Sequence, residues 1–302
     1  SRGLGDVYKR QMIPCARLEF KTFFPTKRRY RESTPLGRNE LRRVALRVDI
    51  MAAAAQNMEL PDDHERPTYE DIHVLIREQS NKIREEFQPN LMVAIGGGGF
   101  FPARVLRTFL KYKDGQNPAK MRNLPIQAIG LSLYEEMPGV TQEQIGTQVV
   151  RTQWLDAGKR ERAGGEDAHP GKNAGGLLGK NVLIVDEVDD SRTTLHYAYT
   201  ELLKDVRQSI AALPDEERAK LPPTRFAIFV VHNKLGPKRA ELPILASPAD
   251  ERIVDGVSTG VYYYAAETTP PVWIDFPWEM TDIVEHNRLA ALAKSKKANA
   301  SS

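Results

Sequence analysis

Residues Asn181 to Leu195 read NVLIVDEVDDSRTTL. The near-continuous apolar run from Val182 to Val185 is typical of a β-strand buried on both faces of a sheet. Four carboxylates follow within five positions, and hydroxyl-bearing residues then lead into a helical pattern that begins at Leu195. Open α/β sheets bind their ligands at the carboxyl ends of the strands. We therefore expect this stretch to join a central strand to a ligand-binding loop.

The loop of this stretch combines two kinds of binding group. Its carboxylates would repel one another at the end of a buried strand unless a cation or a ligand offsets their charge. Its helix start offers backbone N–H groups and the positive end of the helix dipole to a phosphate. A phosphorylated sugar would satisfy both. The carboxylates are Asp186, Glu187, Asp189 and Asp190, and the helix start comprises Ser191, Arg192, Thr193 and Thr194.

Strand and helix patterns alternate on both sides of this stretch. Apolar runs predict further strands at 91–95, 125–133, 225–231 and 261–266. Helical spacing predicts a helix after a capping box at Thr68 and Asp71, and others over 100–112, 193–206 and 281–293. This alternation indicates a doubly wound, parallel α/β sheet. The segment 135–179, rich in glycine and charge, is expected to be a disordered insertion or an active-site lid.

Four successive glycines, Gly96, Gly97, Gly98 and Gly99, lie between a predicted strand and a predicted helix. Glycine permits positive φ and lets backbone N–H groups approach an anion closely. The run is not a P-loop, since no Gly-Lys-Ser/Thr follows, and it lacks the spacing of a dinucleotide fingerprint. Such a run is more often a tight connection than an anion cradle. A second anion-binding loop in the same sheet favours the cradle.

The charge of the chain is unevenly distributed. The 302 residues have a net charge of +3, whereas residues 1–50 carry +8, which leaves −5 for the remainder. The basic excess belongs to this leader, so the rest of the chain gives no compositional argument for nucleic-acid binding. The leader's Arg-rich, acid-poor composition also fits an organellar transit peptide, but we expect a disordered or artefactual segment.

Composition also bears on the compartment. No apolar run approaches the length of a membrane span, so no membrane partner is expected. The single cysteine, Cys15, excludes an intrachain disulfide and any multi-cysteine zinc site. This usage fits a reducing compartment, and a cytoplasmic protein is expected.

Several motifs together resemble the type I phosphoribosyltransferases, in particular the fungal hypoxanthine-guanine phosphoribosyltransferases and their xanthine-using relatives. VLIVDEVDDSRTT resembles the phosphoribosyl-pyrophosphate signature, and IGGGGFFPARVLRTFL, IQAIGLSLYE, HNKLGPKRAELP and WIDFPW resemble further segments of the fungal members. The resemblance implies the type I phosphoribosyltransferase fold, with a small hood built from chain-terminal segments. The resemblance extends from about residue 65 to 290. Because Met51 followed by four alanines is typical of a natural start, we expect the phosphoribosyltransferase domain at 51–290, between the leader and a polar tail at 291–302.

The resemblance implies transfer of a 5-phosphoribosyl group from phosphoribosyl pyrophosphate to a 6-oxopurine. Hypoxanthine or guanine would give IMP or GMP, with release of pyrophosphate. Asp186 and Glu187 would bind the ribose hydroxyls and help to hold Mg²⁺, and Asp190 would exchange a proton near purine N7. Ser191 to Thr194 would bind the 5′-phosphate, although the family pattern has Gly where this chain has Arg192.

The remaining roles implied by the resemblance concern the pyrophosphate and the base. Gly96 to Gly99 would bind the pyrophosphate. Lys234 would donate to the purine 6-oxygen, Trp273 would stack on the base, and the carbonyl of Ile274 would read the 2-position. Without the resemblance, Lys234 would be interpreted as a surface lysine and Trp273 as a plug of the core.

Further residues are expected near the site. Ser132 and Tyr134 precede the long segment and would belong to a lid whose closure excludes water. Arg104 or Arg107 would add positive charge beside the glycine run. The family also suggests a homodimer.

Two other functions stay open. A xanthine-preferring relative would differ in what the backbone near Ile274 offers the purine 2-substituent. A regulator that binds phosphoribosyl pyrophosphate without catalysis is the second alternative, and the presence of Asp190, Lys234 and Trp273 argues against it.

Overall fold

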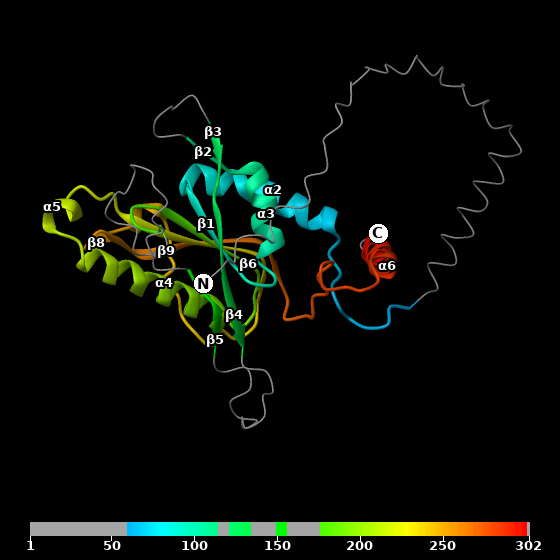
Figure 1. Cartoon of the computed structure of the whole chain (residues 1–302). Helices are drawn as coiled ribbons and strands as arrows, with labels where there is room; N and C mark the ends of the chain where they lie inside the picture. Colours follow the sequence, from blue (N-terminus) through cyan, green and yellow to red (C-terminus); the bar gives the residue numbers. More distant parts are fainter. Residues whose placement is uncertain (1–58, 114–120, 134–148, 156–175, 301–302) are drawn as a thin grey trace, which may run out of the picture. The chain divides into compact units, whose positions relative to one another are not determined.

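A mostly parallel sheet forms the centre of the protein (Figure 1). The computed structural model describes residues 59–113, 121–133, 149–155 and 176–300. Within these ranges seven strands pair side by side, in the order β5 (Val149–Gln153), β4 (Ile126–Leu133), β1 (Leu91–Ile95), β6 (Asn181–Asp189), β7 (Thr224–Lys234), β9 (Val257–Thr269) and β8 (Ile253–Val254). The pairs from β4 to β9 are parallel, and the edge strands β5 and β8 are antiparallel to their neighbours. A separate ribbon pairs β2 (Lys111–Lys113) with β3 (Met121–Asn123).

Helices cover both faces of the sheet. α2 (Tyr69–Glu86) and α3 (Phe100–Phe109) lie on one face, and α4 (Thr193–Ala211) lies on the other (Figure 1). The central strands are buried on both faces because their apolar side chains alternate between them. In β6, Val182 and Ile184 pack with α4, whereas Leu183 and Val185 pack with α2 and α3. The predicted doubly wound α/β sheet is confirmed.

The capping box predicted before α2 is also confirmed. The Thr68 hydroxyl accepts a hydrogen bond from the N–H of Asp71 at 3.2 Å, and the Asp71 carboxylate accepts one from the N–H of Thr68 at 2.9 Å. Ile72, Ile76 and Ile83 form the buried side of the helix. The cap fixes the residue at which α2 begins.

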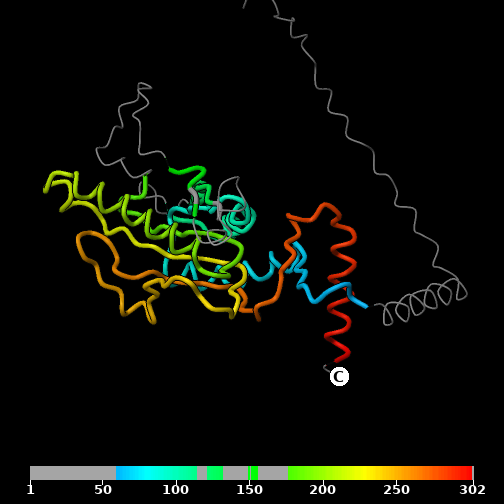
Figure 2. Tube along the Cα trace, turned by 90° about the horizontal axis from the view of Figure 1, so that it is seen from below, coloured from blue at the N-terminus to red at the C-terminus, as the bar shows by residue number. Residues whose placement is uncertain are grey.

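Segments near the two chain ends pack together into a hood. Glu65 exchanges backbone hydrogen bonds with the 273–275 segment, since its N–H donates to Trp273 at 2.8 Å and its carbonyl accepts from Asp275 at 2.9 Å. The C-terminal helix α6 (Ile283–Ala300) lies beside the residues that precede α2 (Figure 2). Lys294 on α6 forms an ion pair with Asp71 at 2.7 Å. The hood is therefore built from terminal segments, as expected.

Several boundaries differ from the sequence expectation. α4, β7 and β9 each extend beyond their predicted ranges. The helix expected to reach residue 112 ends at Phe109, because the chain turns extended at Leu110 and enters β2. The segment expected to be a loop or lid contains the edge strand β5. α6 continues to Ala300 through most of the segment expected to be a polar tail, where Leu292 is buried. The leader expected over 1–50 lies outside the described residues.

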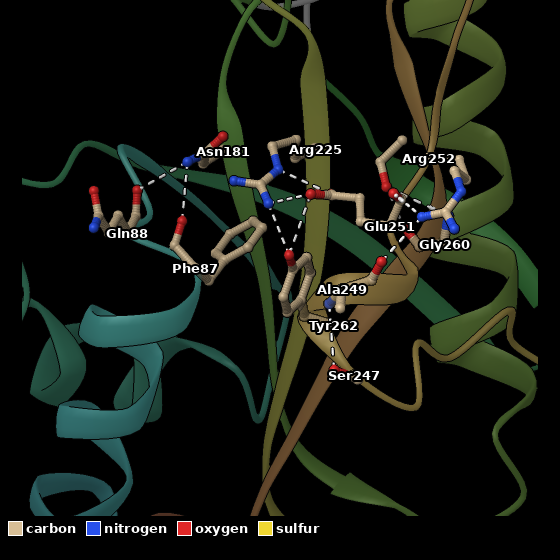
Figure 3. Close-up of polar contacts among 11 residues, drawn as sticks. Phe87, Gln88, Asn181, Arg225, Ser247, Ala249, Glu251, Arg252, Gly260 and Tyr262 are labelled. Atoms are coloured by element: carbon tan, nitrogen blue, oxygen red, sulfur yellow. Dashed lines mark hydrogen bonds and ion pairs between the residues drawn. The ribbon is translucent and has the colours of Figure 1, made fainter.

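Polar groups at the amino ends of the strands are closely paired (Figure 3). At the start of β7, Arg225 binds both carboxylate oxygens of Glu251 and donates to the Tyr262 hydroxyl at 2.7 Å. Asn181, at the start of β6, donates to the carbonyls of Phe87 and Gln88. None of the helices in the described ranges is long and apolar enough to cross a membrane.

Candidate active site

The predicted site residues gather at one edge of the sheet. The glycine run follows β1, the acidic residues end β6, Lys234 ends β7, and Trp273 follows β9. These four strands are parallel neighbours, so their carboxyl ends meet. A pocket of about 370 Å³ opens there. Its lining includes Gly96, Leu131, Asp186, Glu187, Asp190, Ser191, Arg192 and Thr194.

Asp186 and Glu187 form a crowded acidic pair in this pocket. Burial, and then the neighbouring charge of Glu187, raises the pKa of Asp186 well above its ordinary value. The Glu187 Oε2 atom is buried and has no hydrogen-bond partner in the described parts of the chain. Buried carboxylate oxygens without partners are costly. The pair is thus arranged for a ligand or a cation rather than for stability.

The acidic pair fits a divalent cation that takes its other ligands from the substrate. No cluster of three or more His, Cys, Asp or Glu capable of holding a metal occurs in the described ranges. Mg²⁺ is commonly held by one or two carboxylates together with substrate phosphates and water. The unpartnered Glu187 oxygen beside Asp186 supplies that kind of incomplete site.

The loop after β1 must be glycine at several positions. A side chain on Gly98 would overlap the Glu187 carboxylate, and one on Gly99 would overlap the Val185 carbonyl oxygen. Gly97 has a φ of 90°, in the left-handed region. The Gly99 N–H donates to the Ile95 carbonyl at 3.1 Å, whereas no described carbonyl accepts from Gly97 or Gly98. Those two N–H groups can receive an anion.

The loop after β6 presents the amino end of α4 to the same pocket. Its first turn contains no acidic residue, so nothing in that turn offsets the positive end of the helix dipole. The hydroxyls of Ser191 and Thr193 lie 3.0 Å apart. Arg192 has a φ of 69°, which is the left-handed conformation that a glycine would adopt without strain. Arg192 therefore adopts the backbone conformation expected of a glycine, although the glycine itself is missing.

Lys234 lies beside both Asp190 and Trp273. Its Nζ donates to Asp190 Oδ2 at 3.3 Å and lies 5.8 Å from the centre of the Trp273 ring. The indole is 65% exposed, so its face is available to a planar ligand. Ile274 turns its side chain into the core and pairs through its backbone with Glu65. An ammonium, a carboxylate and an exposed aromatic face therefore lie together at this edge of the sheet.

Several predicted residues do not line this pocket. Some of them lie at the same edge of the sheet, namely Gly97 to Gly99, Thr193, Lys234, Trp273 and Ile274. Arg104 and Arg107 line a separate pocket of about 440 Å³ with Thr108, Lys111 and Asn123, which shares no residue with the first. Ser132 lies on β4, but its side chain is not among those described. Tyr134 lies outside the described residues. The assignment of these two residues to a lid stays a prediction.

Three residues at the site had no predicted role. Asp189 is buried at the end of β6, where it contacts Arg192, Lys238 and Tyr263. The sequence places Asp189 in the acidic cluster but predicts no partner for it. Its spacing of three residues from Arg192 was the available signal. The contact with Tyr263 crosses from β9 and leaves no local pattern.

The fold and the site define a class of protein. Two loops rich in backbone N–H groups flank a carboxylate pair, and a lysine with an exposed indole lies at the same sheet edge. This arrangement is that of an α/β protein that binds a phosphorylated sugar together with a planar ring.

Comparison with known proteins identifies the family. The chain is 48% identical over 221 residues to the hypoxanthine-guanine phosphoribosyltransferase of Schizosaccharomyces pombe, with 73% of this chain and 91% of that protein covered. It is 44% identical over 229 residues to xanthine phosphoribosyltransferase 1 of Saccharomyces cerevisiae, with 74% and 93% covered. The chain therefore belongs to the family of fungal hypoxanthine-guanine and xanthine phosphoribosyltransferases.

A solved structure agrees with the fold. The crystal structure of a hypothetical protein from Neisseria gonorrhoeae with bound ppGpp matches at a TM-score of 0.52 and 32% identity, covering 76% of this chain and 97% of that one. A search of family models found no match.

Proposed function

We propose that this chain transfers the 5-phosphoribosyl group of phosphoribosyl pyrophosphate to hypoxanthine or guanine, in purine salvage. The products are IMP or GMP and pyrophosphate. The observation that carries the proposal is the set of groups along one sheet edge: two anion loops, a carboxylate pair between them, and a lysine–carboxylate pair beside an exposed indole. These groups correspond to the pyrophosphate, the 5′-phosphate, the ribose and the purine.

The purine is read by Lys234 and Asp190. The 6-oxygen and N7 of a 6-oxopurine are neighbouring acceptors on one edge of the ring. In the free protein the Lys234 ammonium and the Asp190 carboxylate lie 3.3 Å apart, a spacing suited to two neighbouring atoms. Lys234 donates to the 6-oxygen, and Asp190 holds or moves the proton at N7 as the base changes charge. Trp273 stacks on the ring, and the Ile274 carbonyl faces the 2-position.

The sugar and its two charged groups are held by the loops. The backbone and hydroxyls of Ser191 to Thr194 bind the 5′-phosphate, and Asp186 and Glu187 orient the ribose hydroxyls. The N–H groups of Gly97 and Gly98 receive the pyrophosphate. Asp186 and Glu187 would hold Mg²⁺, which would supply positive charge to offset that of the pyrophosphate.

The chemistry explains why the two loops lie apart. Positive charge develops at C1′ of the ribose as the bond to pyrophosphate breaks, and the purine nitrogen must already be in line. Loops fixed at the ends of β1 and β6 hold the two phosphate groups on either side of that carbon. The Ser132 and Tyr134 segment excludes water at this stage.

The proposal is tested by a spectrophotometric assay of the full chain. Hypoxanthine, guanine, xanthine and adenine are each supplied with phosphoribosyl pyrophosphate and Mg²⁺, and nucleotide formation is followed by absorbance. We expect turnover with hypoxanthine and guanine and none with adenine, whose 6-amino group cannot accept from Lys234. Absence of turnover with every 6-oxopurine would contradict the proposal.

A xanthine preference is the second candidate. Its support is the 44% identity to a relative named xanthine phosphoribosyltransferase 1. Xanthine has a 2-oxo group where guanine has a 2-amino group. The carbonyl of Ile274 can accept a hydrogen bond from the amino group but not from the oxo group, and so it distinguishes the two bases. Turnover mainly with xanthine in the same assay would select this candidate.

We also propose that the protein is a cytoplasmic homodimer. The single cysteine supports a reducing compartment, and the family resemblance supports the dimer. Light scattering coupled to gel filtration is expected to give twice the 34.0 kDa mass of the chain. Imaging of a tagged chain tests the compartment, and localisation to an organelle would instead support a transit peptide.

A further inference from the structure

The 5′-phosphate loop contains a backbone conformation that its sequence does not favour. Arg192 is the N-cap of α4, with φ 69° and ψ −2°. A side chain disfavours this left-handed region, and among non-glycine residues Asn and Asp enter it more readily than Arg. A residue in such a conformation persists only where surrounding contacts hold it. The contacts that hold Arg192 are therefore part of the phosphate site.

Asp189 provides the main contact. The Arg192 Nε and Nη2 atoms both donate to Asp189 Oδ2, at 3.0 and 2.9 Å. The Asp189 side chain is 0% exposed and that of Arg192 is 16% exposed, so water competes little for this ion pair. The guanidinium turns back against the sheet to reach Asp189. Asp189 itself is too deeply buried to touch a substrate.

One residue of β9 and one from the segment after β7 anchor Asp189. The Tyr263 hydroxyl, on β9, donates to Asp189 Oδ2 at 2.6 Å, and the Tyr263 ring lies 5.3 Å from the Arg192 guanidinium. Burial, and then the hydrogen bond to Asp189, raises the pKa of Tyr263. Lys238, which follows β7, lies 3.3 Å from Asp189 Oδ1. Asp189 is thus surrounded by one hydroxyl and two cations.

Lys238 also holds the backbone at the start of the loop. Its Nζ donates to the carbonyls of Asp189, Asp190 and Lys234 at 2.7, 2.8 and 2.9 Å. The N–H of Arg239 donates to the Ser191 carbonyl at 2.9 Å. The chain that follows β7 therefore clamps the loop that follows β6.

We propose that Asp189 is a positioning residue, which holds Arg192 in the left-handed conformation and thereby shapes the loop for the 5′-phosphate. In this chain an ion pair does what a glycine would do through backbone freedom alone. The inference rests on the proposed function in taking the bound anion to be the 5′-phosphate. Arg192 then contributes its backbone to the site, while its Nε and Nη2 atoms donate to Asp189.

The alternative is a buried ion pair that stabilises the fold without affecting the loop. The two explanations predict different results, because the ion pair between Asp189 and Arg192 (the clamp) is needed only when residue 192 has a side chain. Asp189→Asn should weaken phosphate binding in a chain with Arg192. In a chain with Arg192→Gly the same change should have little effect, because glycine adopts the conformation without help.

The experiment measures four full-length proteins: wild type, Asp189→Asn, Arg192→Gly and the double variant. Calorimetry gives the dissociation constant of ribose 5-phosphate, and kinetics give KM for phosphoribosyl pyrophosphate and kcat with hypoxanthine. Asp189→Asn is expected to raise the dissociation constant and KM about tenfold, with kcat changed less than about twofold. Arg192→Gly and the double variant should have similar dissociation constants for ribose 5-phosphate and similar KM values. Both quantities should lie within about threefold of the wild-type values.

Equal weakening in Asp189→Asn and in the double variant would overturn the proposal, and so would an unchanged Asp189→Asn protein. If Asp189→Asn does not fold, Arg192→Ala and Arg192→Gly decide. Both remove the ion pair, but alanine keeps the penalty of the left-handed conformation. Arg192→Ala should bind ribose 5-phosphate about tenfold more weakly than Arg192→Gly, and equal binding would contradict the clamp.

The proposed function and the clamp can fail separately. A wild-type protein that converts no purine would contradict the function. The order of the ribose 5-phosphate dissociation constants would still test the clamp, because that measurement needs no turnover.

Discussion

Two groups of carboxylates, at opposite ends of the central sheet, differ in how their charge is balanced. At the amino ends of the strands, Arg225, Glu251 and Tyr262 satisfy one another (Figure 3). At the carboxyl ends, Asp186 lies against Glu187, whose Oε2 atom has no hydrogen-bond partner among the described residues. Both groups of carboxylates are largely buried.

The pKa shifts show the difference directly. Burial tends to raise the pKa of Glu251, but hydrogen bonds and charge from Arg225 outweigh it, so the pKa lies below the ordinary value of 4.5. Burial and then Glu187 raise the pKa of Asp186 above its ordinary value of 3.8. Paired charge stabilises the amino ends, whereas the unpaired charge of Asp186 and Glu187 prepares the carboxyl end of β6 for a ligand. Variants at each end of the sheet test this difference between paired and unpaired carboxylates.

The largest effect is expected from Asp190→Asn. Asparagine keeps the shape of the side chain but cannot exchange the proton at N7. We expect kcat to fall by at least about 100-fold, while the dissociation constant of phosphoribosyl pyrophosphate stays within about twofold. Steady-state kinetics and calorimetry measure the two quantities. Full activity would show that the base is misassigned.

Glycine loop variants should separate activity from folding. In Gly98→Ala the new methyl group meets the end of the Glu187 side chain, which can move, so we expect kcat/KM to fall about tenfold with little change in Tm. In Gly99→Ala it meets the backbone carbonyl of Val185, which cannot move freely. That variant should lose about 1–3 kcal/mol of stability. Equal Tm values for the two variants would contradict this distinction.

Glu251→Gln should affect stability alone. Removing the charge leaves Arg225 partly unpaired, and we expect a loss of about 1–2 kcal/mol in the free energy of unfolding at pH 7. Because the folded pKa of Glu251 is lowered, its contribution is present above pH 4.5 and is lost as the pH falls through the folded value. Urea unfolding at pH 7 and pH 4 measures this, and kcat should not change. A change in kcat would mean that the two ends are coupled.

The smallest expected change in stability is that of Asp186→Asn, and it is a gain and not a loss. Asp186→Asn removes a buried charge beside Glu187, so we expect a gain of about 1 kcal/mol at pH 7, together with loss of activity. The folded pKa of Asp186 is raised, so the contribution of this carboxyl group to stability is most favourable below pH 3.8 and is lost as the pH rises through the folded value. The gain should therefore shrink toward pH 4. A destabilised variant at pH 7 would contradict the account of this end.

Much of this contrast was predictable from the sequence because its signals are local. β1, β6 and β7 are continuous apolar runs, and their ends carry the glycine run, the acids and Lys234. The parallel sheet then brings those ends together. By contrast, β5 was missed because Val149–Gln153 is a short edge strand in a segment dominated by glycine and charge.

The clamp on the phosphate loop was not predictable. A glycine was expected at residue 192, and the three-residue spacing between Asp189 and Arg192 is a local signal that does not show that an ion pair replaces the glycine. Tyr263 reaches Asp189 from β9, which pairs with β7 and not with β6. That contact depends on the lateral order of strands and on side-chain packing. Sequence spacing records neither.

The most direct test is a crystal structure of the protein with IMP, pyrophosphate and Mg²⁺. We expect the 5′-phosphate on the N–H groups and hydroxyls of residues 191–194, and the purine against Trp273 with its 6-oxygen at Lys234. The pyrophosphate should lie on the loop 96–99. The account would be contradicted by an IMP phosphate bound away from the end of β6, or by a base that does not contact Lys234 and Trp273.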